Sequence, residues 1–293
     1  MLYPVIDIGS NTVKLAVLDE DRIDLQAPVY FKAVPLNLRS KTQNNTLKSQ
    51  DTDSLCHLLK SFINAAKRFT QAPPLAFATA SLRGLENEGQ IVQRIFQETG
   101  LHVRVLSGEE EAYFSFLGAR QSLPVKAGMV VDLGGGSTEL LTFRKNRVEK
   151  AVSLPFGCLT LYHRFFADEK QDYENCEKMV MKRLKEEAPF LSGNSILLTG
   201  GSAKAVLKYK NVLEEKRTFT LGTAQMRKVR RHYEKGDTER KEKVAAILKD
   251  RFRLIPPALA VFSQITKFYG KEQVFVCRGG VREGYLFDYL QKN

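Results

Sequence analysis

The stretch VVDLGGGSTELL at Val130–Leu141 decides the fold class, because an apolar run ends in an acid that three glycines and two hydroxyl residues follow. A related stretch, VIDIGSNTVKLAV at Val5–Val17, also runs from apolar residues into an acid, a glycine and short polar residues. Glycine lets backbone N–H groups turn toward an anion, since no Cβ blocks its approach. Each turn by itself fits an ordinary β-hairpin equally well. Two matching turns instead favour a duplicated α/β unit with one phosphate-binding turn in each half.

We expect the backbone and hydroxyl groups of both turns to bind phosphate oxygens. The first turn supplies Gly9, Ser10, Asn11 and Thr12, and the second supplies Gly134, Gly135, Gly136, Ser137 and Thr138. The acid at each strand end, Asp7 or Asp132, can hold a hydrated Mg²⁺ beside the phosphate. Neither turn has the GxxxxGK(S/T) pattern of a P-loop or the GxGxxG pattern of a dinucleotide-binding fold.

The composition is that of a globular chain long enough for two domains, with 293 residues, 43% of them hydrophobic and 27% charged. We expect a cytoplasmic protein without membrane contact. No apolar run approaches the ~18 residues of a membrane helix, and the start lacks the basic region of a signal peptide. The four cysteines form no CxxC pair and the four histidines no HExxH motif. Any metal is therefore expected on carboxylates, which points to Mg²⁺ rather than Zn²⁺.

The net charge of +12 is concentrated in one part of the chain. Residues 204–253 hold 16 Lys or Arg against 7 Asp or Glu, a net charge of +9. Such a bias suits an anionic partner, but a solvated helical surface explains it equally well. The sequence has no RNA-binding signature, zinc finger or clear helix-turn-helix, so we expect no specific nucleic-acid partner.

Alternating strands and helices predict an α/β fold. In the first half the predicted strands cover residues 5–8, 14–18, 75–78 and 101–107, and the predicted helices cover 53–69 and 88–99. In the second half the predicted strands cover 129–133, 140–143 and 147–152, and strand–glycine–helix units cover 195–208 and 273–290.

The predicted joint between the halves is the segment 122–128, which contains Pro124. We therefore expect a first domain over residues 1–123 and a second over 124–283, with a C-terminal helix at about 284–293 that packs back on the first. The polar segment 37–50 is expected to be a loop.

Several blocks along the chain are similar to those of one family. They are DIGSNTVKL, ATASLRGLENEGQ at 78–90, VLSGEEEAYFSFLG at 105–118 and VVDLGGGSTEL, with weaker matches at SLPFGCLTL, TGGSAKAV and GGVREGYL. The chain resembles the exopolyphosphatase/guanosine pentaphosphate phosphohydrolase (Ppx/GppA) family of the actin/Hsp70/sugar-kinase superfamily, in its short two-domain form. The resemblance implies two duplicated ribonuclease-H-like (actin-like ATPase) domains that flank a central cleft. It also implies hydrolysis of a terminal phosphoanhydride bond, in inorganic polyphosphate or in the stringent-response nucleotide guanosine pentaphosphate (pppGpp).

The resemblance also assigns roles to single residues. Glu111 matches the family's catalytic base, which orients and deprotonates the attacking water. Arg83 matches an arginine that can bind phosphate oxygens and offset charge in the transition state, although a surface arginine on a loop is the alternative. Asp132 and Glu139 match carboxylates that hold Mg²⁺, as Asp7 can in the first turn. Glu139 on a solvent-facing strand position is the alternative reading of that residue.

A purely structural explanation covers part of the SGEEEA block. Ser107 and Glu110 form the pattern of a capping box, and acids in a first helical turn suit the helix dipole. This explanation accounts for Glu109 and Glu110 without a function. Glu111 is the residue for which the resemblance adds a catalytic role.

The chain departs from the family pattern at Thr160, Arg253 and Arg278, where the family often has an arginine, an aspartate and an aspartate. These departures bear on the choice of substrate more than on the chemistry. They also leave open a protein that binds polyphosphate or a guanosine polyphosphate without turning it over. An ATP-dependent kinase of the same superfamily is a third hypothesis, and it needs an adenosine pocket near residues 200–203. A homodimer is possible in each case.

Overall fold

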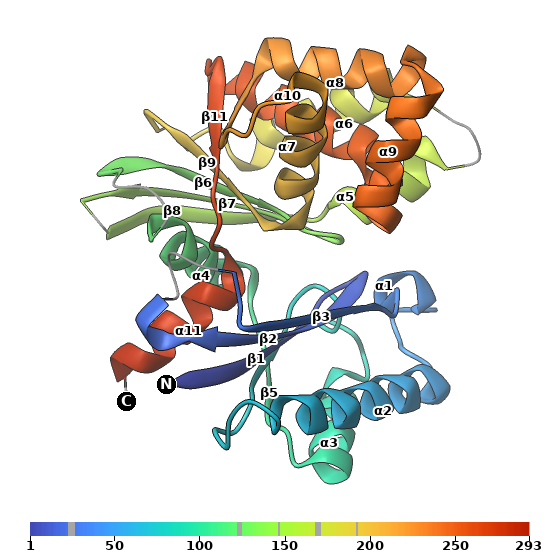
Figure 1. Ribbon diagram of the computed structural model, residues 1–293, viewed down its shortest axis with the longest axis vertical. Coiled ribbons are helices and arrows are strands. Elements are labelled where there is room, and N and C mark those ends of the chain that lie inside the picture. The colour runs from blue at the N-terminus through green and yellow to red at the C-terminus, as the bar shows by residue number, and fades with distance from the viewer. Residues whose placement is uncertain (23–26, 122–124, 146, 168–170, 192, 293) are drawn as a thin grey trace.

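The computed structural model describes residues 1–22, 27–121, 125–145, 147–167, 171–191 and 193–292. Two β-sheets lie one above the other, each with its own layer of outer helices, and two helices lie between them (Figure 1). No helix among these residues is both long and apolar enough to cross a bilayer. The first three residues of the predicted joint, 122–124, lie outside the described residues, and where the domain boundary runs stays a prediction.

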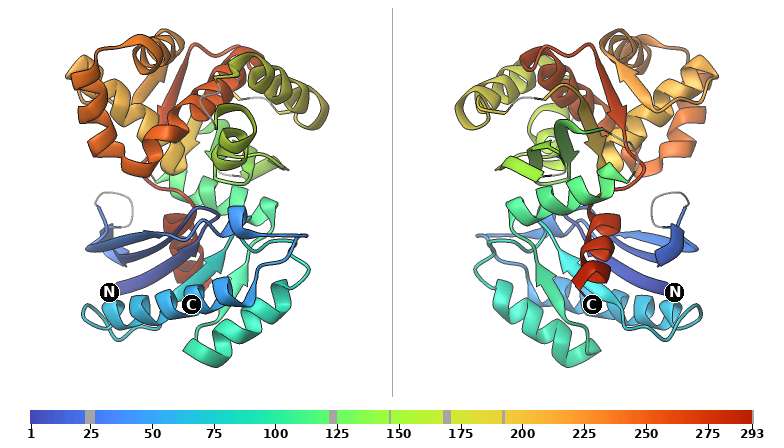
Figure 2. Two further views of the ribbon diagram at one scale, coloured as in Figure 1. Left: turned by 90° about the vertical axis from the view of Figure 1, so that its right-hand side faces the viewer. Right: turned by 90° about the vertical axis from the view of Figure 1, so that its left-hand side faces the viewer.

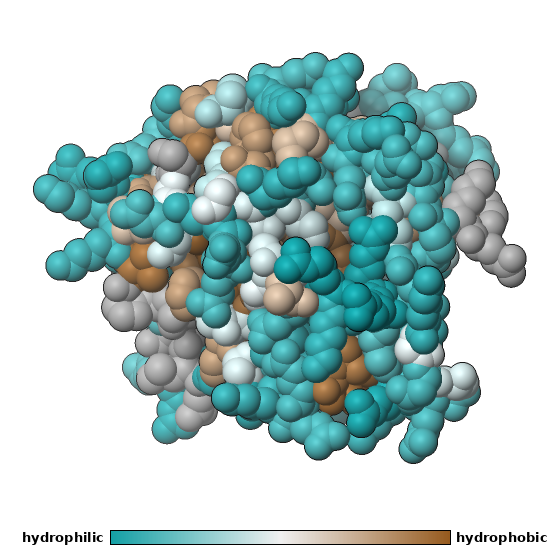
Figure 3. Space-filling view, turned by 90° about the horizontal axis from the view of Figure 1, so that it is seen from above, coloured by the Kyte–Doolittle hydropathy of each residue, from teal (hydrophilic) through white to brown (hydrophobic). Residues whose placement is uncertain are grey.

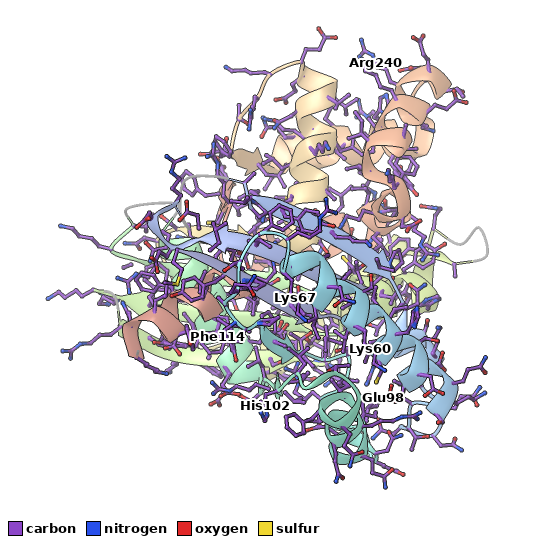
Figure 4. The ribbon with its side chains drawn as sticks, turned by 60° about the horizontal axis from the view of Figure 1, so that its bottom comes forward. Lys60, Lys67, Glu98, His102, Phe114 and Arg240 are labelled. Carbon is purple, nitrogen blue, oxygen red and sulfur yellow. The ribbon has the colours of Figure 1, made fainter. Side chains whose placement is uncertain are left out.

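The first sheet has the strand order β3-β2-β1-β4-β5. Strands β1, β2 and β3 form an antiparallel meander, and β4 and β5 continue the sheet in parallel with β1. The helices α2 and α3 cover its lower face, where Lys60 of α2 forms an ion pair with Glu98 of α3 (Figures 1 and 4). The bounds are β1 (Leu2–Ile8), β2 (Thr12–Asp19), the 3₁₀ turn η1 (Glu20–Arg22), β3 (Tyr30–Pro35), α1 (Leu38–Lys41), α2 (Ser49–Ala66), β4 (Leu75–Ala78), α3 (Glu88–Thr99) and β5 (Val103–Val105).

The second sheet repeats this plan with the order β10-β11-β9-β6-β7-β8. Strands β6, β7 and β8 form the antiparallel meander, and β9 and β11 run parallel to β6. The helices α6 to α10 gather on the side away from the first sheet (Figure 1). The bounds are β6 (Ala127–Leu133), β7 (Thr138–Arg144), β8 (Arg147–Leu154), α5 (Cys158–Leu161), the π-helical turn η2 (Tyr162–Phe166), α6 (Tyr173–Glu187), β9 (Ile196–Thr199), α7 (Gly200–Glu214), β10 (Thr220–Gly222), α8 (Thr223–Lys235), α9 (Thr238–Leu248), the 3₁₀ turn η3 (Lys249–Leu254), α10 (Ile255–Phe268) and β11 (Gln273–Val276).

Helices α4 (Gly108–Arg120) and α11 (Val281–Lys292) pack against each other between the sheets. One buried apolar cluster joins both sheets through them, with Phe77 from the first sheet, Phe114 from α4 and Leu141 from the second sheet. A glycine allows the two helices to approach closely, since a Cβ on Gly284 of α11 would lie 1.9 Å from the carbonyl oxygen of Phe114 on α4. The C-terminal helix thereby lies beside β1 as well as α4 (Figure 2).

Segment 37–50 is not the loop that its polarity predicts. Helix α1 occupies part of it, and α2 already begins at Ser49. Leu38 and Leu47 are buried and anchor the segment on the first sheet's core. Two apolar residues in a polar stretch carry too little periodicity to reveal such an anchor from the sequence.

Candidate active site

The two glycine turns close in the same way. The N–H of Gly9 donates to the carbonyl of Thr12 at 3.3 Å, and that of Gly134 donates to the carbonyl of Ser137 at 3.0 Å. Each turn therefore joins the first two strands of its meander, with Asp7 or Asp132 just before it.

The two turns face each other across the space between the sheets. A Cβ on Gly135 would lie 3.2 Å from the Cβ of Ser10, and one on Gly136 would lie 3.0 Å from its Oγ. A third glycine adds to this close packing, because a Cβ on Gly157 would lie 2.5 Å from the carbonyl carbon of Gly135. The duplicated pattern predicted that the turns meet, and these contacts agree with it.

The segment after β3 supports the first turn. The N–H of Arg39 on α1 donates to the carbonyl of Ser10 at 3.1 Å, and the N–H of Leu36 donates to that of Asn11 at the same distance. In the second turn the hydroxyl of Thr138 is already used, since it donates to the carbonyl of Phe156 at 2.6 Å. Residues 36–39 are a support that the sequence analysis missed.

Arg83 follows β4 of the first sheet and contacts the second glycine turn. Its Nη1 donates to Oε2 of Glu111 at 2.9 Å and to the carbonyl of Leu106 at 3.0 Å. Its Nη2 donates to Oγ of Ser137 at 3.2 Å and lies 3.5 Å from Oε1 of Glu139. The guanidinium thus contacts residues of two other segments, 106–111 and 137–139, which an exposed loop arginine does not do.

Glu111 differs from its neighbours on α4 by being buried. Ser107 and Glu110 form the predicted capping box, while Glu109 points into solvent. Burial raises the pKa of Glu111 well above 4.5, and the nearby charge of Glu139 raises it further, while Arg83 opposes both effects. The carboxyl group therefore stays partly protonated at pH values where an exposed glutamate is fully charged.

Glu139 is also buried, so its alternative reading as a solvent-facing strand residue is wrong. Its Oε1 accepts from the hydroxyl of Ser153 at 2.8 Å, while its Oε2 has no hydrogen-bond partner among the described residues. Burial raises the pKa of Glu139 to about 7, and the charge of Asp132 adds to this effect. Asp132 itself accepts from the hydroxyl of Ser115 at 2.5 Å, and burial raises its pKa.

The comparison with protein families identifies the chain. The model of the Ppx/GppA phosphatase family matches residues 32–293. The chain belongs to this family.

Solved structures agree on the Ppx/GppA fold. A family member from Aquifex aeolicus matches with a TM-score of 0.80 at 23% identity, over 100% of this chain and 98% of that chain. An exopolyphosphatase from Cytophaga hutchinsonii matches with a TM-score of 0.84 at 20% identity, over 100% of this chain and 98% of that chain. These similarities establish the α/β, two-domain actin-like fold that the sequence predicted.

The arrangement of the carboxylates in this Ppx/GppA protein indicates whether they could bind the Mg²⁺ that the sequence analysis expects. No group of three or more His, Cys, Asp or Glu side chains in the described ranges is arranged to hold a metal ion by itself. Mg²⁺, however, is usually held by one or two carboxylates together with water and substrate phosphates. The unpartnered Oε2 of Glu139, with Asp132 near enough to shift its pKa, fits that manner of binding. Asp7 is less available, since it pairs with Nζ of Lys14 at 2.6 Å.

The three departures from the Ppx/GppA pattern have local roles. The hydroxyl of Thr160 accepts from the N–H of Gly157 at 2.9 Å and so caps α5. Arg253 stacks on the ring of Tyr162 at 5.2 Å. Arg278 stacks on a second aromatic ring, that of Phe219, at 4.9 Å.

The basic stretch 204–253 divides into two parts. Eight of its sixteen cations lie on α8 and α9, where the outer face is mainly hydrophilic (Figure 3). Arg240 lies on α9, away from Lys60 on α2 (Figure 4). Two others lie near the start of α7: the Nζ of Lys204 donates to the carbonyl of Arg278 at 2.5 Å, and a Cβ on Gly201 would lie 1.9 Å from Nη1 of Arg251. The sequence analysis did not single out either residue.

Proposed function

We propose that this Ppx/GppA protein hydrolyses the terminal phosphoanhydride bond of inorganic polyphosphate or of guanosine pentaphosphate and releases orthophosphate. Membership of a phosphatase family supports the reaction class. The main structural support is the contact of Arg83 with both Glu111 and Ser137. This contact supports a role for the carboxylate of Glu111 as base and for the guanidinium beside the second glycine turn, where we propose that the terminal phosphate is bound.

In this mechanism the oxygen of a water molecule attacks the terminal phosphorus, and the bond from that phosphorus to the bridging oxygen breaks. The carboxylate of Glu111 takes the proton of the water. The leaving phosphate departs with the bridging oxygen and its negative charge. Arg83 and the N–H groups of the two glycine turns offset charge on the terminal phosphate during the transfer.

The burial of Glu111 sets the pH dependence that we expect. A general base has to be ionised, and the raised pKa of Glu111 moves its ionisation toward neutral pH. Turnover should therefore rise with pH across this pKa. Arg83 keeps the pKa from rising further, so the same guanidinium orients the base and favours its charged form.

Mg²⁺ would be held by Glu139 and Asp132, with Asp7 as a further carboxylate from the first turn. When bound, the ion would neutralise part of the charge of the substrate phosphates. The charge of Asp132 raises the cost of ionising the buried Glu139, and a cation beside them would lower that cost.

An ATP-dependent kinase is less compatible with the turn that begins α7. A Cβ on Gly200 would lie 2.4 Å from Oδ1 of Asp132, and one on Gly201 would lie 1.9 Å from Nη1 of Arg251. Both glycines are thus covered by charged side chains of the site, where the kinase hypothesis needs room for adenosine. This packing supports hydrolysis over transfer of phosphate from ATP.

The test measures orthophosphate release from tripolyphosphate, long-chain polyphosphate, pppGpp and ATP, with Mg²⁺ and with chelator. Release from polyphosphate without any nucleotide would support the hydrolase and exclude an obligatory kinase. Tight binding of polyphosphate or pppGpp with no release of phosphate above the level of Glu111→Gln would contradict it and select a non-catalytic binding protein.

A further inference from the structure

Strand β8 forms an edge of the second sheet. Among the described residues it pairs with β7 on one side and with no strand on the other (Figure 1). Residues 147–150 at its start are all exposed, whereas Ser153 and Leu154 near its end are half-buried and buried. In an antiparallel edge strand every second residue turns its N–H and C=O groups away from the sheet. The exposed part of β8 can therefore accept a further strand.

A groove of about 640 Å³ lies between this part of β8 and helix α4. Two large apolar side chains in it stay open to solvent, since Tyr113 of α4 is 37% exposed and Val148 of β8 is 39% exposed. Covering such side chains in an interface lowers the free energy of the bound state. The apolar lining consists of Tyr113, Phe116, Leu117, Leu141, Val148 and Ala151. The groove can thus take apolar side chains of a segment that lies along β8.

The exposed part of β8 and the hairpin that leads into it are strongly basic. Residues 144–150 hold four Lys or Arg against one Glu, a net charge of +3. Arg120 in the last turn of α4 lines the same groove as Arg147. The backbone N–H of Lys145 donates to the carbonyl of Lys126 at 2.7 Å, which brings the segment before β6 to the same place. Cations from three segments therefore gather at this end of the second sheet.

Most of this positive charge is not neutralised by nearby acids. Three glutamates line the groove. Glu149 pairs with Arg144 at 3.0 Å, and Glu110 pairs with Arg104. Within the described ranges Glu109 takes part in no ion pair, and the same holds for four cations, which are Arg120, Lys126, Lys145 and Arg147. An acidic partner would find these four cations available.

The charge of this surface favours one kind of partner. A second copy of this chain that paired β8 with β8 would bring two segments of +3 together, and like charges opposite each other destabilise a strand pair. An inorganic polyanion could meet the cations, but it has no apolar side chains for the groove and no backbone groups for the strand edge. An extended acidic segment of another protein matches the charge, the groove and the edge.

We infer that β8 and the groove beside α4 form a docking surface for a partner protein, which adds an extended segment of alternating acidic and apolar residues as a further strand. Alternate side chains of a strand face opposite sides. One set can therefore enter the groove while the other lies along the cations of the hairpin. The surface is separate from the proposed active site, because Ser153, which donates to Glu139, lies at the other end of β8. The inference does not depend on the proposed hydrolysis.

The experiment measures binding of a fluorescein-labelled peptide of alternating glutamate and valine, EVEVEVE, to the full chain by fluorescence anisotropy. The peptide KVKVKVK reverses the charge. The peptide EVEPEVE keeps the charge but interrupts the strand, because proline removes a backbone donor.

The protein variants are Arg147→Glu and Val148→Asn. Arg227→Glu on α8 and Ile247→Asn on α9 are matched controls, since they change an exposed cation and an apolar side chain of similar exposure away from β8. Thermal unfolding of each variant checks that it is folded, and Arg147→Gln provides a milder change of the same charge.

We expect EVEVEVE to bind, and KVKVKVK and EVEPEVE to bind at least about tenfold more weakly. Arg147→Glu should weaken binding of EVEVEVE about fivefold or more, and Arg147→Gln should weaken it less. Val148→Asn should weaken it about threefold or more. Both controls should bind as wild type does. Hydrogen exchange of residues 147–151 should slow in the complex, because the added strand takes up outward N–H groups.

Several results would overturn the inference. Failure of EVEVEVE to bind wild type, equal binding by the variants and their controls, or slowed exchange only outside residues 147–151 would each do so. Binding of long-chain polyphosphate that depends on Arg147 but not on Val148, without binding of EVEVEVE, would assign the surface to an inorganic polyanion. A dimer in size-exclusion chromatography that Val148→Asn dissociates would assign it to a second copy of this chain.

Discussion

The two glycine turns have the same backbone but opposite charges at one pair of equivalent positions. In the first sheet Asp7 lies opposite Lys14 across the hairpin, and in the second sheet Asp132 lies opposite Glu139. The first pair is an ion pair at 2.6 Å, whereas the second pair consists of two buried acids. The same kind of hairpin thus holds an ion-paired acid in the first sheet and two buried acids in the second sheet.

This difference indicates at which of the two turns a proton or a cation should have the larger effect. Burial raises the pKa of Glu139 to about 7, and the charge of the neighbouring Asp132 adds to this effect, so the two carboxylates cannot both ionise cheaply. Glu111 lies on the same side, in contact with Arg83 and near Glu139. The residues that act on the attacking water and on Mg²⁺ are therefore expected beside the second turn. The first turn, with Lys14, is expected mainly to bind the anionic substrate.

The largest effect is expected at the base on the chemical side. Glu111→Gln should lower turnover by ~10²-fold or more, because the amide has nearly the same shape but cannot take a proton. Substrate binding should stay close to wild type. Steady-state phosphate release and equilibrium binding check this, with the exposed Glu109→Gln on the same helix as control. Turnover near the wild-type level would mean that Glu111 is only an acidic residue in the first turn of α4 and not the base.

The next effect is expected at Arg83. Arg83→Ala should lower turnover by roughly ten- to a hundredfold, since it removes a charged donor from both Glu111 and Ser137. Binding should weaken less than turnover falls. Arg147→Ala, on an exposed position of β8, is the control. A loss of binding with unchanged turnover would place Arg83 among the residues that only hold substrate.

The metal response should distinguish the two turns. Asp132→Asn and Glu139→Gln should each raise the Mg²⁺ concentration needed for half-maximal activity by about tenfold, because each removes a carboxylate from the acid pair. Asp7→Asn should change it less, since Lys14 already neutralises Asp7. Equal shifts in all three variants would show that both turns bind the metal. This result would contradict the contrast drawn between the two turns.

Stability against pH gives a smaller test of the same contrast. Below pH 4.5 Glu139 is protonated in both the folded and the unfolded chain; between 4.5 and about 7 the folded chain binds the extra proton. Stability therefore falls as pH rises through this window. Glu139→Gln should remove roughly 1–3 kcal/mol of that fall between pH 5 and pH 8, measured by urea unfolding. Parallel pH profiles for the two proteins would mean that the pKa of Glu139 is not raised.

The smallest effect concerns the exposed cations of α8 and α9. If they help to gather a long polyanion, its affinity should fall more steeply with salt than the affinity for pppGpp. The comparison needs apparent affinities at low and at physiological salt. Equally shallow falls would mean that these cations form a solvated surface.

Much of the first sheet was predictable because its signals are local. Strand β4 and helix α3 have the predicted bounds, and the capping box of Ser107 and Glu110 is present. Several elements were not predicted, and among them strand β3 and helix α10 escaped prediction for different reasons. Strand β3 is an edge strand with a weak burial pattern, and α10 is apolar on nearly every side because it lies inside the second half.

The sequence by itself determined the two turns, the acid that precedes each of them and the family to which they point. It did so because glycine, acid and strand patterns act over a few neighbouring residues. Only the tertiary structure decided that Arg83 reaches Glu111 and Ser137. Periodicity reports which face of its own element a side chain occupies, but not which distant element packs against that face. The opposite charges at Lys14 and Glu139 are visible in the sequence, yet they acquire meaning only from the hairpin register and from burial.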